Sequence, residues 1–181
     1  MVEYLANFRG SAKSVLDLAT IDKTITDVIP SADTLTFNGT SSCIKAILSD
    51  AIGTNDFILN LRYKLTNNTA GDTLIYNGDF QLYNNGSSII FNIKGNKLYV
   101  CDTDTTQHQV TIVRASGVIT VYIDGNANSD TLTCTDELID RFFYLATNNG
   151  VDMDVSTDNI TGGWRYHLFA YRSCHQHYLH R

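Results

Sequence analysis

The chain has 181 residues, a formal net charge of −6 and a single proline, and 43% of its residues are hydrophobic. This length suits one domain with a sizeable core, and the acidic balance argues against nucleic acid and anionic membranes as partners. No apolar run is long enough for a transmembrane helix, so we expect no membrane insertion. The first residues lack the basic start and apolar stretch of a signal peptide.

Residues 1–30 differ in pattern from the remainder and are expected to form an N-terminal arm or edge element. Residues 11–19 fit two helical turns, with Ser11 as the N-cap. Alternatively, residues 4–8 and 25–29 are strands that flank a loop. The arm packs on an edge of its own sheet or crosses to a neighbouring subunit, because its apolar side chains need a place to bury.

From residue 34 the chain becomes a succession of short β-prone runs separated by turn sequences such as Asn-Gly. Strands are predicted at 35–37, 44–48, 57–65, 73–77, 80–83, 89–93, 97–101, 110–114, 118–123, 142–145 and 164–171. Residues 134–140 are expected to form one helical turn. Many short strands with a turn every ~10 residues predict an all-β sandwich or barrel.

The strongest local signal lies at residues 108–125. Two β-branched runs flank Ala115-Ser116-Gly117, which predicts a hairpin that pairs residues 108–114 with 118–124. Alternate residues of the second strand, Ile119, Val121 and Ile123, should share one apolar face. Such a hairpin cannot stand alone in water, so the rest of the chain must supply a second sheet.

This hairpin resembles the central hairpin of the concanavalin A-like lectin/glucanase superfamily, and most closely that of its laminin-G-like jelly-roll modules. The residues that carry the resemblance are His108, Val110, Ile112 and Arg114, the glycine turn, and Val121-Tyr122-Ile123-Asp124-Gly125. Residues 35–40, 57–64 and 163–172 resemble further strands of the family, so the likeness covers residues 33–172. The resemblance implies a two-sheet antiparallel β-sandwich at 31–173, followed by a tail at 174–181. Lectins, glycosidases, adhesion modules and virion proteins share this fold, so the fold leaves the function open.

Catalysis is not expected. Retaining glycosidases need two carboxylates about 5–5.5 Å apart, and the glucanases of this superfamily provide them with a Glu-x-Asp-x-x-Glu run. The sequence has no such run, and its nearest acidic cluster, at residues 152–158, contains aspartates only. A glycoside hydrolase of the same fold is therefore the least favoured interpretation.

Two turn regions supply the parts of a sugar site. Sugar sites combine an aromatic ring, which contacts the C–H face of the sugar, with amide or carboxylate groups that bind hydroxyls. The candidate ligand-binding residues are Tyr76, Asn77, Asp79, Tyr83 and Asn84. The alternative is that these tyrosines are ordinary strand residues with their hydroxyls at the surface.

Calcium is the one candidate cofactor, and we expect that none is required. Asp152, Asp154 and Asp158 offer the oxygen ligands that calcium prefers, and the resemblance implies calcium at a sheet rim. Asp102 and Asp104 form a second candidate, but a solvated acidic turn is the favoured interpretation of both. The tail residues Cys174, His175, His177 and His180 could hold a transition metal, although a loose tail is favoured. The four cysteines are far apart in sequence, so we expect free thiols.

We therefore expect a non-catalytic, lectin-like carbohydrate-binding module that mediates attachment. The Asn/Thr-rich, proline-poor composition and the extra arm resemble phage-encoded lectin-like domains, which implies a virion or extracellular surface, with a glycan or protein as partner. The alternative is a structural virion subunit, such as a head decoration, fibre or tail component, that binds no glycan. Either one is expected to be a homo-oligomer, with a trimer as the candidate oligomeric state.

Overall fold

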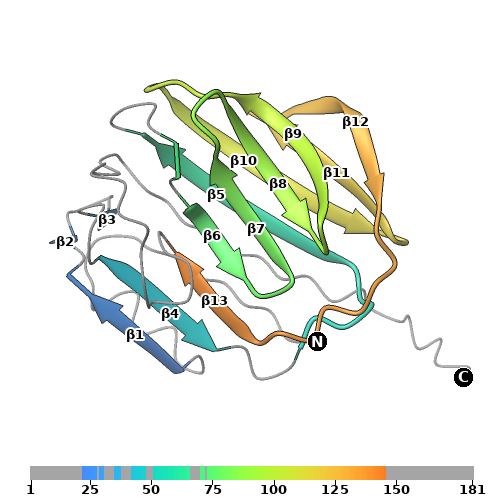
Figure 1. Cartoon of the computed structure of the whole chain (residues 1–181), viewed down its shortest axis with the longest axis horizontal. Helices are drawn as coiled ribbons and strands as arrows, with labels where there is room; N and C mark the ends of the chain where they lie inside the picture. The colour runs from blue at the N-terminus through green and yellow to red at the C-terminus, as the bar shows by residue number, and fades with distance from the viewer. Residues whose placement is uncertain are drawn as a thin grey trace, which may run out of the picture.

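The computed structural model describes residues 22–27, 29–30, 35–37, 42–47, 51–65, 70–71 and 73–145. Over these ranges the secondary structure consists of strands, as Figure 1 shows. Nowhere in them is there a helix of the length and apolarity that crossing a membrane would need.

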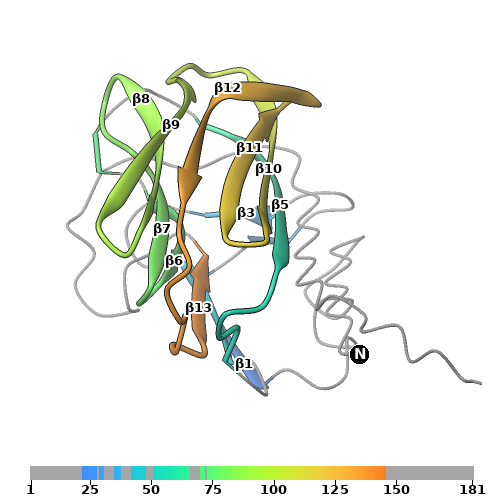
Figure 2. The same ribbon diagram turned by 90° about the vertical axis from the view of Figure 1, so that its right-hand side faces the viewer.

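Two antiparallel sheets face each other across the core (Figure 2). The seven-stranded sheet contains, in spatial order, β1 (Asp22–Thr26), β4 (Cys43–Ile47), β13 (Phe142–Leu145), β6 (Thr73–Asn77), β7 (Phe80–Asn84), β8 (Ser88–Ile93) and β9 (Asn96–Asp102). The four-stranded sheet contains β12 (Asn126–Thr133), β11 (Val118–Ile123), β10 (Gln107–Ala115) and β5 (Phe57–Lys64). A short pair, β2 (Ile29–Pro30) and β3 (Leu35–Thr36), stands apart from both sheets. The predicted two-sheet jelly-roll sandwich is confirmed.

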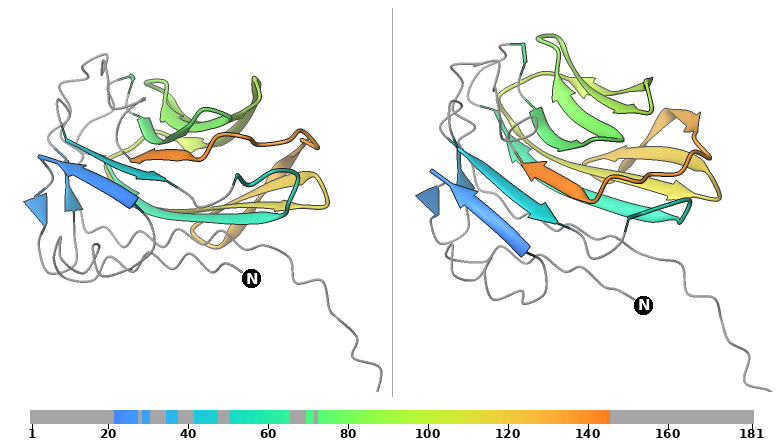
Figure 3. Two further views of the ribbon diagram at one scale, coloured as in Figure 1. Left: turned by 90° about the horizontal axis from the view of Figure 1, so that it is seen from below. Right: turned by 60° about the horizontal axis from the view of Figure 1, so that its bottom comes forward.

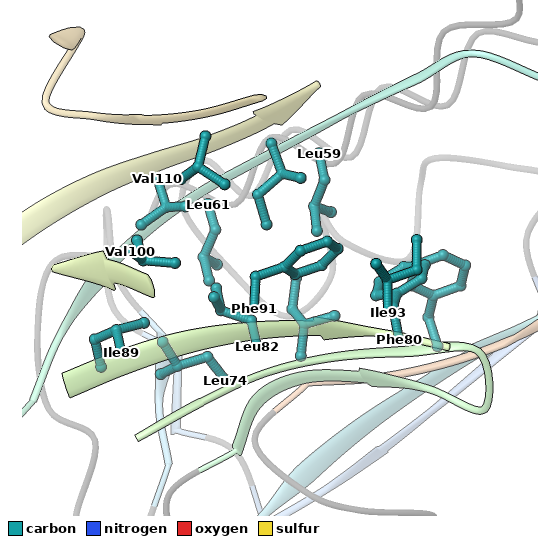
Figure 4. Close-up of a cluster of buried hydrophobic side chains, with 14 of the residues drawn as sticks. Leu59, Leu61, Leu74, Phe80, Leu82, Ile89, Phe91, Ile93, Val100 and Val110 are labelled. Carbon is teal, nitrogen blue, oxygen red and sulfur yellow. The ribbon is translucent and has the colours of Figure 1, made fainter. Parts of the chain in front are cut away.

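The core fills the space between the sheets because each strand alternates inward and outward side chains. Figure 4 shows Leu59, Leu61 and Val110 of the four-stranded sheet opposite Leu82 and Phe91 of the seven-stranded sheet. All five side chains are at most 3% exposed. The apolar side chains of the core cluster therefore lie between the two layers, which Figure 3 shows from two further directions.

The predicted hairpin is confirmed. β10 and β11 pair from Val110 with Ile123 to Ala115 with Val118. The turn residues Ser116 and Gly117 have φ values of 51° and 78°, as a two-residue type I′ turn requires. A turn of this type matches the right-handed twist of the strands that it joins.

The helical turn expected at residues 134–140 is wrong. Gly53 and Leu138 form an antiparallel bridge, with Gly53 N donating to Leu138 O at 2.8 Å and Leu138 N donating to Gly53 O at 3.0 Å. Leu138 is fully buried. The segment is extended because backbone pairing and burial of this leucine outweigh a weak local helix preference.

Arg114 fastens the two loops that meet at this bridge. Its guanidinium is 1% exposed and lies 5.4 Å from the ring centroid of Phe57. It donates to the carbonyl oxygens of Gly53 (2.7 Å), Asn55 (2.7 and 3.0 Å) and Asp136 (3.1 Å). These bonds compensate the guanidinium for the water that it loses on burial.

Strand β1 belongs to the region expected to form the N-terminal arm. Its five residues pair with β4 from Asp22 with Ile47 to Thr26 with Cys43, which makes β1 the edge strand of the seven-stranded sheet. The expectations for residues 4–8, 11–19, 164–171 and 174–181 lie outside the described residues. The domain limits at 30 and 173 stay predictions.

Candidate functional site

The five predicted sugar-binding residues separate into two groups. Tyr76 and Tyr83 lie half-buried on the outer face of the seven-stranded sheet. Asn77, Asp79 and Asn84 are buried, with 0%, 7% and 0% exposure. The two turn sequences therefore combine surface rings with interior polar groups.

The buried side chains at the turn between β6 and β7 bind the segment that leads into β13. Asn77 Nδ2 donates to the carbonyl oxygens of Asp140 (3.1 Å) and Phe142 (2.9 Å). Asp79 Oδ2 accepts from the Asp140 backbone N at 2.8 Å, and its Oδ1 lies 2.6 Å from Lys94 Nζ. The hydrogen bond to Asp79 raises the pKa of Lys94. Both predicted residues are thus occupied by contacts within the chain.

Asn84 is likewise held by hydrogen bonds within the chain, at the turn between β7 and β8. Its Oδ1 accepts from Gly86 N at 2.7 Å and from Thr103 Oγ1 at 2.9 Å. The second bond ties this turn to the segment that follows β9. Sugar binding by these three residues stays a prediction, and the candidate site lies instead on the exposed outer face of the sheet.

The outer face of the seven-stranded sheet carries a row of aligned side chains. Six of its strands contribute one residue each, and each residue is the register partner of the next. We call this set the outer row, and its members in spatial order are Lys45, Tyr144, Tyr76, Gln81, Asn92 and Lys97. Strand alternation aims these side chains away from the core, because their sequence neighbours Phe143, Ile75, Leu82, Phe91 and Leu98 are buried.

Aromatic rings and one lysine fill the end of the outer row at β4 and β13. The rings of Tyr76 and Tyr144 are 6.0 Å apart between centroids, and those of Phe142 and Tyr144 are 6.5 Å apart. Lys45 Nζ lies 4.5 Å from the Phe142 centroid and 5.4 Å from the Tyr144 centroid. Phe142 is 38% exposed, so this aromatic cluster reaches solvent.

A second set of rings follows alongside the outer row. Tyr83 pairs with Ile90, and Ile90 pairs with Tyr99, which is 43% exposed. Tyr99 donates its hydroxyl to Asp102 Oδ1 at 3.0 Å, and desolvation together with this bond raises the pKa of Tyr99. The outer face thus presents aromatic surface on both flanks of the amides Gln81 and Asn92.

The two amides differ in how they are satisfied. Gln81 Nε2 donates to Thr73 Oγ1 at 2.9 Å. Asn92 Oδ1, by contrast, is buried and has no hydrogen-bond donor in the part of the chain that the structure describes. A buried acceptor without a partner costs about 1–3 kcal/mol. A ligand hydroxyl that donated to this oxygen would remove that cost.

A separate polar cluster closes one end of the core around His108. Its Nδ1 lies 2.7 Å from Asp124 Oδ2, and its Nε2 lies 3.1 Å from both carboxylate oxygens of Asp104. Burial lowers the pKa of His108, but the bonds to the two aspartates outweigh it and raise that pKa overall. Tyr63 lies alongside, with its ring centroid 5.9 Å from that of the imidazole. The cluster links the loop after β9 to the turn between β11 and β12.

The metal hypotheses have no geometric support among the described residues. Asp102 accepts from the Tyr99 hydroxyl, whereas Asp104 contacts Thr106 and His108. The described ranges hold no group of three or more His, Cys, Asp or Glu side chains arranged for a metal ion. Asp152, Asp154 and Asp158 lie outside the described residues. Cys43, Cys101 and Cys134 are free thiols.

No protein-family model and no curated protein sequence matches this chain, whereas solved structures do. The binding domain of botulinum neurotoxin serotype D matches with a TM-score of 0.62 at 13% identity, covering 84% of this chain and 43% of that one. The apo Crh5 transglycosylase matches with a TM-score of 0.57 at 15% identity, covering 93% of this chain and 85% of that one. Domain 4 of AbnA, an extracellular arabinanase from Geobacillus stearothermophilus in complex with arabinotriose, matches with a TM-score of 0.53 at 11% identity, covering 83% of this chain and 82% of that one.

The likeness is one of fold. These neighbours agree with the concanavalin A-like jelly roll that the hairpin resemblance implied, and they include binding domains as well as enzymes. The chain spans less than half the length of the botulinum binding domain. The laminin-G-like grouping and the phage origin stay predictions.

Sequence reasoning found Tyr76 of the outer row, and Tyr83 alongside it, but missed the other members of the row. Tyr144 was part of a predicted strand, and Gln81, Asn92 and Lys97 occupy outward positions in theirs. Alternation alone could have placed each of them opposite the apolar positions. It could not have shown that they align, because the strand order β4-β13-β6 joins segments far apart in sequence.

Proposed function

We propose that this protein is a non-catalytic carbohydrate-binding module that uses the outer row. The observation that carries the proposal is the alignment of aromatic and amide side chains along one register of the sheet. A sugar ring packs its C–H face on Tyr76 while its hydroxyls bond to Gln81 and Asn92. The unpartnered Asn92 Oδ1 supports the proposal, because a rotation of this side chain would let the buried oxygen accept a hydrogen bond from a sugar hydroxyl.

The non-catalytic part of the proposal has its own support. Hydrolysis of a glycosidic bond by the usual route needs two carboxylates that flank the bond. The described members of the outer row include no carboxylate, and the sequence contains only two glutamates, Glu3 and Glu137. Release of reducing ends from a bound glycan would contradict this part of the proposal and leave the binding site intact.

The biological role follows from the binding activity. We infer that the module mediates attachment at a phage virion or bacterial surface, as a homo-oligomer in which residues 1–30 contribute to the interface. The Asn/Thr-rich composition supports this role, together with the edge position of β1 within that segment. Several copies of a weak sugar site would raise the overall avidity without any new contact.

A glycan array probed with the full chain tests the site. Tyr76→Ala should lower affinity for the best glycan about ten-fold, as the loss of a stacked ring does. The matched control is Tyr122→Ala, because Tyr122 is a half-buried strand residue of the other sheet. Equal losses in both variants would contradict the assignment of the site, and an array without any binder would contradict carbohydrate binding itself.

A second variant separates the outer row from the residues that sequence alone suggested. Asp79→Ala removes the partners of Lys94 Nζ and of the Asp140 backbone N. It should lower the urea midpoint of unfolding while the folded fraction keeps its glycan affinity. Loss of affinity at unchanged stability would instead place Asp79 in the sugar site.

A further inference from the structure

Both ends of the outer row are cationic. Lys45 stands at one end and Lys97 at the other, and the residues between them carry no charge. The chain as a whole has a net charge of −6, so this face departs from the overall balance. A ligand that lies along the row therefore meets positive charge at both of its ends.

The geometry of the row sets the kind of ligand. Neighbouring strands lie about 4.8 Å apart, so five steps separate the Cα atoms of Lys45 and Lys97 by about 24 Å. That distance suits an extended chain of several sugar units running across the strands. Lys97 is exposed, and Lys45 keeps ammonium N–H groups for a ligand while its charge rests against Phe142 and Tyr144.

Asn92 supplies the connection between charge and sugar. It is the direct register partner of Lys97, so its amide and the Lys97 ammonium belong to adjacent positions of the row. Its unpartnered oxygen is buried, and the broad terminal torsion of an asparagine side chain lets a small rotation present that oxygen. A sugar that carries an anionic group beside a hydroxyl satisfies both residues at once.

We propose that the outer row takes a linear anionic glycan, carboxylated or sulfated, laid across the strands. An acidic group pairs with Lys97, a hydroxyl of the same unit donates to Asn92 Oδ1, and a ring packs on Tyr76. Further along the chain a second acidic group reaches Lys45. This inference rests on the proposed carbohydrate binding and adds the ligand class to it.

The test uses the full chain and matched oligosaccharides. An oligogalacturonate represents the carboxylated arm, a sulfated oligogalactan the sulfated arm, and an unmodified oligogalactan the neutral arm. Binding to at least one acidic arm should exceed binding to the neutral arm and weaken as salt rises from 50 to 500 mM, roughly as charge screening predicts. Lys97→Gln should lower acidic binding about two- to five-fold, the range of an exposed ion pair, and should lower neutral binding by a smaller factor.

The controls distinguish the two proposals. Lys64→Gln removes an exposed lysine of the four-stranded sheet and should leave the binding of all three oligosaccharides unchanged. Equal binding of neutral and acidic arms, lost in Tyr76→Ala, overturns the anionic ligand and keeps carbohydrate binding. Failure of all three arms and of the glycan array overturns both. If an oligothymidylate binds as tightly as the acidic oligosaccharides, the effect is one of general charge and the inference is overturned. A homodimer that Tyr76→Ala dissociates also overturns it, because a second copy of the chain then covers this face.

Discussion

At the scale of single residues, His108 shows how one side chain can join two parts of the fold. Both imidazole nitrogens face a carboxylate, Asp124 on one side and Asp104 on the other. A neutral imidazole has only one N–H, so it can donate to one of these partners only. Full pairing of the cluster therefore requires the imidazolium form.

The pH dependence of stability follows from the directions of the pKa shifts. The folded pKa of His108 is raised above 6.5, so the stability it contributes is present below pH 6.5 and is lost as pH rises through the folded pKa. Despite desolvation, which acts the other way, hydrogen bonds lower the folded pKa values of Asp104 and Asp124 below 3.8. Their contribution is therefore present above pH 3.8 and is lost as pH falls further.

We predict that His108→Gln destabilises the protein most at about pH 5 and progressively less from pH 6.5 to 9. Urea unfolding of both proteins at several pH values measures the difference. The ring protons of His108 should titrate in NMR spectra with a midpoint above 6.5. A midpoint at or below that value, or a constant difference between the two proteins, would show that the aspartates do not hold the charged form.

At the scale of elements, three hairpins depend on turns whose two central residues both have positive φ. The pairs are Lys94-Gly95, Ser116-Gly117 and Asp124-Gly125. Glycine adopts this conformation without steric cost, whereas serine at the first position costs about 1–2 kcal/mol relative to an unstrained residue. Asparagine tolerates it better than serine, which is why Asn-Gly is the preferred sequence for such turns.

Substitutions in the turn between β10 and β11 should therefore move stability in opposite directions. Ser116→Asn should raise the free energy of unfolding by about 0.5–1 kcal/mol. Gly117→Ala should lower it by about 1–3 kcal/mol, because alanine is strained at a φ of 78° and its Cβ would lie 2.8 Å from Thr135 Cγ2. Urea unfolding at one pH measures both changes.

Gly125→Ala is the matched control for this pair. Gly125 has a φ of 84°, and a Cβ built on it meets nothing within 4 Å. Its loss of stability thus reports the backbone strain alone, and the excess loss in Gly117→Ala reports the contact with Thr135. Equal losses would mean that the Thr135 side chain moves aside at no cost.

At the scale of the whole molecule, the strands that end each sheet in the described part of the chain decide how copies can associate. β1 pairs with β4 along its full length and leaves its own outer edge as the end of the seven-stranded sheet. β12 ends the four-stranded sheet, and Asn128 Nδ2 ties it to the other layer by donating to Tyr99 O at 2.6 Å. Edges of this kind must be covered, paired or guarded to avoid unwanted association.

Two N-terminal deletions distinguish the roles of the arm. Removing residues 1–20 retains β1, whereas removing residues 1–27 also exposes the backbone of β4. If the arm contributes to a homo-oligomer, the first deletion should lower the mass measured by light scattering. The second should cause self-association through the open β4 edge. A full-length chain that is monomeric at tens of micromolar would contradict the oligomer.

The sequence by itself determined the fold class and most of the strands. The β-branched run of 108–125 and its Ser116-Gly117 break specified a hairpin, because side-chain period and turn conformation are local properties. β12 was missed, since Asn126 and Ala127 have little strand preference and are extended only through their pairing with Ile123 and Tyr122 of β11. The expected helical turn at 134–140 was wrong for the same reason, with Gly53 as the distant partner.

The site was decided by the tertiary structure. Asn77, Asp79 and Tyr76 look equally suited to a sugar when they are read in sequence, yet folding buries the first two in contacts with Asp140 and Phe142. Only the sheet order brings Tyr144 beside Tyr76 and Lys45 beside Tyr144, whereas the pairing of Asn92 with Lys97 belongs to a local hairpin. Strand alternation fixes which face a side chain takes, but the pairing of strands distant in sequence fixes its neighbours, and a binding site is made of neighbours.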